Sequence, residues 1–150
     1  MYTTNFVYKA PPAVLESLKR LFSVLSVEKI NFEHAAVITD NRQLKETLFQ
    51  FLQESNQYLN EIKCQIESLG GDTAVKNDFK ATEENLPVKD SKDVYDYCSK
   101  CENRILAAYR EILNQSVIVK ELRHMVRYQL NGLLCAFLQF RILGDSFRRI

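Results

Sequence analysis

One stretch near the C-terminus constrains the fold of this chain more than any other feature of its sequence. From Leu130 to Leu143, apolar side chains occupy almost the whole circumference of a helix, and such a helix must be covered. The stretch is too short to cross a bilayer, which needs roughly 20 apolar residues, and Asn131, Gln139 and Arg141 interrupt it. We therefore expect protein to cover it: the other helices of a bundle and a second copy of the chain.

The overall composition favours an all-α domain in the cytoplasm. A chain of 150 residues suits one domain with a sizeable core, and 4 glycines and 3 prolines are few for a fold with many turns. The 20 Lys and Arg residues balance 19 Asp and Glu residues, so we expect no nucleic-acid partner. We see no secretory signal at the N-terminus, and a cytosolic protein of this size needs no disulfides for its 4 cysteines.

Apolar residues that recur every three or four positions predict four helices, each with one buried stripe. The helices are expected at about 13–38, 41–69, 91–113 and 117–143. Their main stripe residues are Leu18, Leu21, Leu25, Phe32 and Ala35; Leu44, Leu48, Phe51, Tyr58, Ile62, Ile66 and Leu69; Val94, Cys98, Cys101, Ile105, Ala108 and Ile112; and Val119, Leu122, Val126, Leu130, Leu133, Phe137 and Phe140. Two short turns and one long connection favour an up-down-up-down four-helix bundle.

The segments between the helices set the expected domain limits. Residues 1–12 are expected to form a flexible arm, and residues 13–144 a single bundle domain. The polar, aperiodic residues 72–89 are expected to form a long connection. Asp40 and Gln43 have the spacing of a capping box, which predicts that Asp40 caps the second helix. Gly70 is expected to end that helix, as Gly144 is expected to end the fourth.

Four polar residues are predicted to lie at one level near the middle of the bundle, one on each helix. They are Glu28, Glu54, Glu102 and Gln129. Ferritin-type bundles bind two metal ions with one Glu from each of two helices and a Glu-x-x-His from each of the other two. Gln57 and Gly132 stand where the two histidines would be. These four residues are the candidate ligands for iron or manganese; a buried polar layer that fixes helix register, or solvated glutamates, are the alternatives.

The two histidines are expected on the surface. Glu121 and His124 have the Glu-x-x-His spacing, but they lie closer to a turn than the predicted polar level. His34 follows Glu33 near the end of the first helix. No nucleophile and base stand together, and no glycine-rich phosphate loop is present in the sequence, so we expect a protein that is not an enzyme.

The cysteines are expected to pack in the core. Cys98 and Cys101 have the spacing of a zinc or redox pair, yet no second pair follows, and they lie about two turns inside a predicted helix. A thiol sensor is the alternative role for this pair. Cys64 and Cys135 are expected to act as small apolar fillers.

Short motifs along the chain resemble an uncharacterised bacterial family of ferritin-like four-helix bundles. The motifs are Glu33-His34-Ala35-Ala36, Leu48-Phe49-Gln50, Glu54-Ser55-x-x-Tyr58, Leu69-Gly70-Gly71, Cys98, Glu102-Asn103 and Ala108-Tyr109. The resemblance implies a ferritin-like fold without a settled activity. Departures from the family pattern weaken a metal-dependent role: Asn103 replaces an acid, Phe137 replaces a common histidine, and the chain has no Trp.

Two functions remain in view at this point. The first is a non-enzymatic helical bundle, a binding or stress-associated module that self-associates through the fourth helix. The second is a di-metal carboxylate protein, either an oxidase or a metal store. The missing histidines favour the first.

Overall fold

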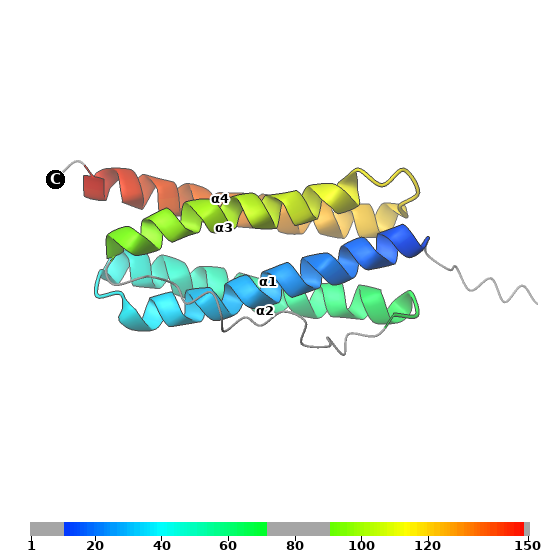
Figure 1. Ribbon diagram of the computed structural model, residues 1–150, viewed down its shortest axis with the longest axis horizontal. Helices are drawn as coiled ribbons and strands as arrows, with labels where there is room; N and C mark the ends of the chain where they lie inside the picture. Colours follow the sequence, from blue (N-terminus) through cyan, green and yellow to red (C-terminus); the bar gives the residue numbers. More distant parts are fainter. Residues whose placement is uncertain (1–10, 72–90, 149–150) are drawn as a thin grey trace, which may run out of the picture.

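The computed structural model describes residues 11–71 and 91–148, which form a bundle of four helices (Figure 1). The helices are α1 (Pro12–Ile38), α2 (Arg42–Ser68), α3 (Ser91–Leu113) and α4 (Lys120–Arg148). The expected long connection at 72–89 and the first ten residues of the expected arm lie outside the described residues. Pro12, expected in the arm, already belongs to α1, and α4 continues beyond residue 144.

The helices do not follow the up-down-up-down order expected from the sequence. Leu15, in the first turn of α1, lies against Gly71 just beyond the end of α2, so α1 and α2 are antiparallel. Gln115, beyond the end of α3, lies 3.4 Å from Ser17 near the start of α1, so α3 is also antiparallel to α1. The order is therefore up-down-down-up, with α2 and α3 pointing the same way (Figure 1).

The length of the second connection allows this order. A turn of a few residues forces the next helix to run back beside the previous one, as α2 does beside α1. Residues 72–90 provide up to about 60 Å of extended chain. That exceeds the length of about 40 Å of a 27-residue helix such as α2. The chain can therefore return to the end of the bundle where α2 began.

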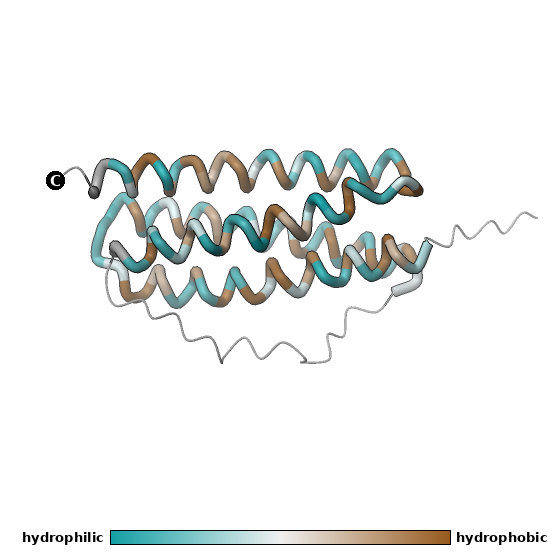
Figure 2. The backbone as a smooth tube through the Cα atoms, turned by 45° about the horizontal axis from the view of Figure 1, so that its top comes forward, coloured by the Kyte–Doolittle hydropathy of each residue, from teal (hydrophilic) through white to brown (hydrophobic). Residues whose placement is uncertain are grey.

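The predicted stripes form the core. Every stripe residue predicted on the first and third helices is buried, and so are those of the other two except the partly buried Leu69, Val119 and Leu130. Figure 2 shows hydrophobic and hydrophilic residues alternating along each helix. The rings of Phe32 and Phe51 meet edge to face with centroids 4.4 Å apart, and Phe140 completes the cluster from α4.

The ends of α2 combine one wrong and one correct prediction. Its N-cap is Asn41, not Asp40: the Asn41 side chain accepts a hydrogen bond of 3.0 Å from the Leu44 amide. At the other end Gly70 has φ +83°, and the Gly71 amide bonds back to the Ile66 carbonyl at 2.8 Å. This is the left-handed glycine ending expected from the sequence.

Gly144 does not end α4, which runs on to Arg148. A side chain at Gly144 would come within 3.3 Å of the Tyr95 ring on α3. Because Gly144 has no side chain, α4 can lie close to Tyr95 of α3 at this point, and the glycine serves helix packing and not helix ending.

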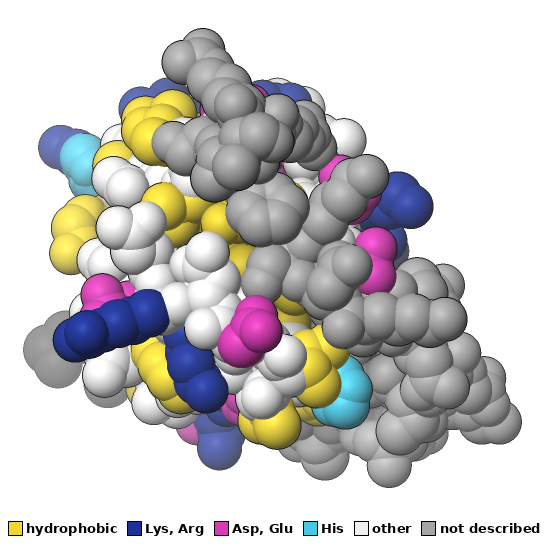
Figure 3. Space-filling view, turned by 90° about the vertical axis from the view of Figure 1, so that its left-hand side faces the viewer, with side chains coloured by type: hydrophobic (Ala, Val, Ile, Leu, Met, Phe, Trp, Pro, Cys, Tyr) yellow, Lys and Arg dark blue, Asp and Glu magenta, His cyan; other side chains and the backbone are white. Residues whose placement is uncertain are grey.

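No helix in the described ranges is long and apolar enough to cross a membrane. The end of the bundle that carries the α1–α2 turn shows acidic and basic side chains interspersed (Figure 3).

Candidate functional site

The four candidate metal ligands are divided among different helix interfaces. Glu28 lies where α1 meets α3, Glu102 contacts α4 from α3, and Gln129 reaches α2 from α4. Each has its own set of protein partners, and none of the hydrogen bonds found joins two of the four. We call the α1–α3 interface, with the Glu28 contacts, the polar seam, and the α2–α4 interface, with the Gln129 contacts, the aromatic seam.

Glu28 is a buried carboxylate held by two side chains of α3. Only 3% of the residue is exposed; its Oε1 accepts a hydrogen bond of 3.0 Å from Nε of Arg104 and lies 3.0 Å from Nη2 of the same guanidinium. Its other oxygen accepts from the Tyr97 hydroxyl. Tyr97 in turn accepts a bond of 2.7 Å from the Asn31 amide. Both oxygens of the carboxylate are thus engaged, and its charge is neutralised by an arginine.

The surroundings of Glu28 keep its neighbours protonated. Burial, followed by the hydrogen bond to Glu28, raises the pKa of Tyr97 far above its ordinary value. The Arg104 guanidinium also lies over the Tyr97 ring, 5.7 Å from its centroid. Tyr97 therefore acts as a hydrogen-bond donor to the carboxylate, not as a proton source.

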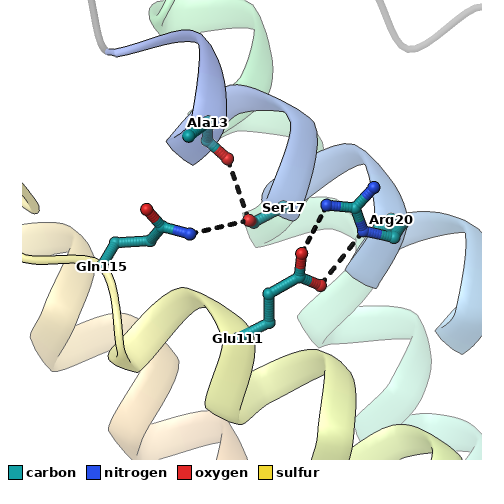
Figure 4. Close-up of polar contacts among 5 residues, drawn as sticks. All are labelled: Ala13, Ser17, Arg20, Glu111 and Gln115. Atoms are coloured by element: carbon teal, nitrogen blue, oxygen red, sulfur yellow. Dashed lines mark hydrogen bonds and ion pairs between the residues drawn. The ribbon is translucent and has the colours of Figure 1, made fainter.

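The polar seam continues along α1 toward its N-terminus (Figure 4). Arg20 donates two hydrogen bonds to the two oxygens of Glu111, with Nε 3.1 Å from Oε2. The buried Ser17 hydroxyl donates to the Ala13 carbonyl at 2.9 Å and accepts from Gln115. The hydrogen bond from Arg20 lowers the pKa of Glu111. The Arg20–Glu111 ion pair is more exposed than the Arg104–Glu28 pair.

Gln129 lies in the aromatic seam and is fully buried. Its carbonyl oxygen accepts a bond of 2.9 Å from the Tyr109 hydroxyl, and its amide donates to Glu61 at 3.0 Å and to the Tyr58 carbonyl at 3.3 Å. Burial raises the pKa of Tyr109 well above its ordinary value. One amide thus ties together α2, α3 and α4, which is a structural role that needs no metal.

Tyr58 fills the space beside Gln129. A side chain on Gly132 would lie 2.0 Å from the Tyr58 hydroxyl oxygen, so only glycine leaves room for it there. Burial, followed by the charge of Glu54, raises the Tyr58 pKa to about 12. The position where the ferritin pattern would place a histidine is therefore a contact point for a tyrosine.

Glu54 is the candidate ligand with an oxygen still available. Its buried Oε2 has no hydrogen-bond partner among the described residues. Burial raises the pKa of this carboxyl, and a hydrogen bond from Gln50 partly opposes the shift. The neighbouring Ser55 hydroxyl is fully buried and also lacks a partner among these residues.

Glu102 forms an ion pair with Arg141 across the α3–α4 interface, at 2.8 Å. The pair borders a cavity of about 40 Å³ that Cys98, Tyr95 and Gly144 also line. Such a cavity holds about one water molecule and is far smaller than a pocket for an organic ligand.

The cysteines divide into two classes. Cys98 and Cys101 are buried as expected, and burial, followed by the charge of Glu28, raises the pKa of both thiols. Thiolate is the reactive form, so this environment disfavours redox chemistry. Cys64 and Cys135 are exposed, and their prediction as core fillers is wrong.

Among residues 11–71 and 91–148, no three His, Cys, Asp or Glu side chains are grouped so that they could hold a metal ion. His34 and His124 are exposed, as expected. The sequence pattern predicted Glu28 as one of four polar residues at mid-bundle but did not identify its partner Arg104. Arg104 lies seven residues after Tyr97 on the same face of α3, which is the signal that could have found it.

No protein-family model, no curated protein and no solved structure matches the chain significantly. The resemblance to a bacterial ferritin-like family therefore rests on the short motifs alone, while the four-helix all-α fold is shown by the structure.

Proposed function

We propose that this protein is a non-enzymatic helical bundle that acts as a binding module through its outer helix surfaces. One observation carries the proposal: three of the four candidate ligands already have protein partners that satisfy them. Arg104 neutralises Glu28, Arg141 neutralises Glu102, and Tyr109 and Glu61 engage both ends of the Gln129 amide. A metal ion would have to displace these partners.

We further propose a ferritin-like arrangement and a cytoplasmic location. A single long crossover between the second and third helices is the connectivity of ferritin-like bundles, which supports the first point. All four cysteines are free, which supports a reducing compartment.

A di-metal carboxylate protein is the second candidate, and Glu54 is the residue that favours it. An unpartnered buried carboxylate oxygen is uncommon in a folded protein and suits an ion or a water molecule. Its nearest acidic neighbour along the same face is Glu61, whose carboxylate accepts from Gln129.

Metal loading separates the two candidates. The purified chain is incubated with iron or manganese, desalted, and measured as metal ions per chain, beside Glu54→Ala, Glu102→Ala and the exposed-site control Glu67→Ala. We expect all four proteins to retain the same trace amount. Retention of about two ions per chain, the content of a ferritin-type centre, with loss in Glu54→Ala and Glu102→Ala but not in Glu67→Ala, would overturn the proposal.

A further inference from the structure

The outward face of α4 carries large apolar side chains that the bundle leaves uncovered. Tyr128 is 64% exposed, Leu138 51% and Ile142 50%. Cys135, between them on the same face, is exposed as well. The inward face of this helix packs in the core, and about half or more of each of these outward side chains remains uncovered.

The exposed positions have the spacing of a coiled-coil seam. They are Tyr128, Asn131, Cys135, Leu138, Ile142 and Asp145, all of them exposed. The steps between them alternate between three and four residues, which is the a/d pattern that lets two helices pack side by side. Asn131 is a polar residue inside this pattern, and in an antiparallel pair centred between residues 136 and 137 it lies opposite Ile142 of the partner subunit.

The exposed face of α4 is complementary to a second copy of itself when the two helices run antiparallel. A two-fold axis between residues 136 and 137 brings Cys135 opposite Leu138 of the partner subunit. The same axis brings Tyr128 opposite Asp145 of the partner subunit, where a phenol can donate to a carboxylate. Arg127, which is exposed beside Tyr128, then approaches that same carboxylate. A parallel pairing would instead bring each Asp145 and each Arg127 against its own copy, which is repulsive.

We infer that this face binds a second copy of the chain, with the two α4 helices antiparallel across a two-fold axis. The inference rests on the proposed binding role and names its partner. A two-fold contact uses the same surface on both subunits, and the pattern above fits that requirement. The face presents about six side chains, fewer than the 20 to 30 residues of a standard interface, so we expect dissociation in the micromolar range.

Sedimentation equilibrium of the full chain tests the dimer. We expect a reversible monomer–dimer equilibrium between about 1 and 500 μM, and at least about 30-fold weaker association in Leu138→Glu, the loss typical of a central contact. Phe49→Glu is the matched control, because Phe49 is 50% exposed but lies on α2. A wild-type chain that stays monomeric at 500 μM, or a dimer that Phe49→Glu weakens as much as Leu138→Glu, overturns the inference.

Cross-linking tests the register. In the inferred dimer the two Cys135 Cα atoms are offset by about 4.5 Å along α4 and separated by about 8–10 Å across it. A bis-maleimide of about that span should therefore join two Cys64→Ser chains, because Cys98 and Cys101 are buried. Cys135→Ser, which keeps Cys64, should stay uncross-linked. The opposite pattern would overturn the inference.

A charge exchange tests the direction of the helices. Arg127→Asp and Asp145→Arg should each weaken association by about 3-fold or more, the scale of a surface ion pair, and the double variant should restore it. No recovery in the double variant would overturn the antiparallel pairing.

The outcomes also separate this inference from the proposed function. A chain that stays monomeric and retains no metal leaves the binding role in place and removes the second copy as its partner. A dimer that retains about two metal ions per chain keeps the second copy as the partner of this face and overturns the proposed function.

Discussion

The polar seam and the aromatic seam join the same two halves of the bundle by different means. At the polar seam, Glu28 and Arg104 form an ion pair inside the interface, and Arg20 and Glu111 form a second pair nearer the surface. At the aromatic seam, Phe51 packs against Phe137 with ring centroids 5.7 Å apart, and among residues 11–71 and 91–145 the polar bridge between α2 and α4 is that of Gln129. One seam is specified by charge and the other by shape.

The difference shows how helices distant in the sequence find their alignment. Two apolar helix stripes can shift past one another by a turn at a small cost in free energy, because one leucine is replaced by another at each contact. A buried ion pair cannot, since a shift of one turn would leave Glu28 buried without its cation. The buried Gln129 amide resists the same shift at the aromatic seam, so each seam has one polar contact that fixes its alignment, and the apolar side chains around both supply the burial.

The largest effect on stability is expected when the buried ion pair of the polar seam is broken. Arg104→Met removes the cation and leaves Glu28 buried, which should cost about 2–4 kcal/mol of unfolding free energy. The double variant Glu28→Leu with Arg104→Met should recover most of this loss, because no charge is then buried. Urea unfolding followed by circular dichroism measures both. A single variant as stable as the wild type would show that Glu28 does not need its partner.

A shape defect tests the aromatic seam. Gly132→Ala drives a methyl group into the Tyr58 hydroxyl and should cost about 1–3 kcal/mol. In a Tyr58→Phe background the hydroxyl is absent and the nearest ring atom, Cζ, lies 3.1 Å from the added methyl group, so the same substitution should cost clearly less, because the closest clash is gone and alanine favours helix. Thermal unfolding of the four proteins gives the sign. An equal cost in both backgrounds would contradict the contact.

A smaller effect is expected from Glu54. Its pKa is raised in the folded state, so its ionisation opposes folding as pH rises from about 4.3, the unfolded value, through the folded value. Glu54→Gln should therefore be more stable than the wild type at pH 7, by less than about 1 kcal/mol, and the gain should shrink toward pH 4. Glu67→Gln is the exposed control. A gain independent of pH would point to packing instead.

The smallest effect is expected at the exposed end of the polar seam. Arg20→Ala should cost about 0.5 kcal/mol or less at neutral pH, because solvent surrounds both partners. The pKa of Glu111 is lowered, so this contribution is present above the unfolded pKa and is lost as pH falls through the folded one. Added salt should also remove it. A larger loss in 1 M salt would rule out an ion-pair origin.

The sequence predicted the parts of the fold that depend on local pattern. Four helices and nearly all of the buried stripes follow from the spacing of apolar residues, and the ending at Gly70 follows from the conformational freedom of glycine. Helix directions did not follow, because the length of the connection at 72–89 permits either direction. The end of α4 was missed because Gly144 serves packing against Tyr95, which no local rule reveals.

The candidate site was predicted as four residues at one level, yet each residue has separate partners. Sequence counting places residues along a helix axis, but it does not show which way each side chain points around the bundle. Arg104 and Arg141 decide the roles of Glu28 and Glu102, and both arginines looked like ordinary surface residues. Long flexible side chains that reach inward from an exposed position are hard to foresee from pattern alone.

The return of the chain through the second connection has a consequence for how the protein folds. The α1–α2 and α3–α4 pairs are each made of neighbouring segments, so each can assemble early with little loss of chain entropy. Both seams, by contrast, join residues more than 65 positions apart, as Gln129 and Glu61 do. Closing the two seams is therefore expected to be the slow step of folding, because it joins the segments that lie farthest apart along the chain.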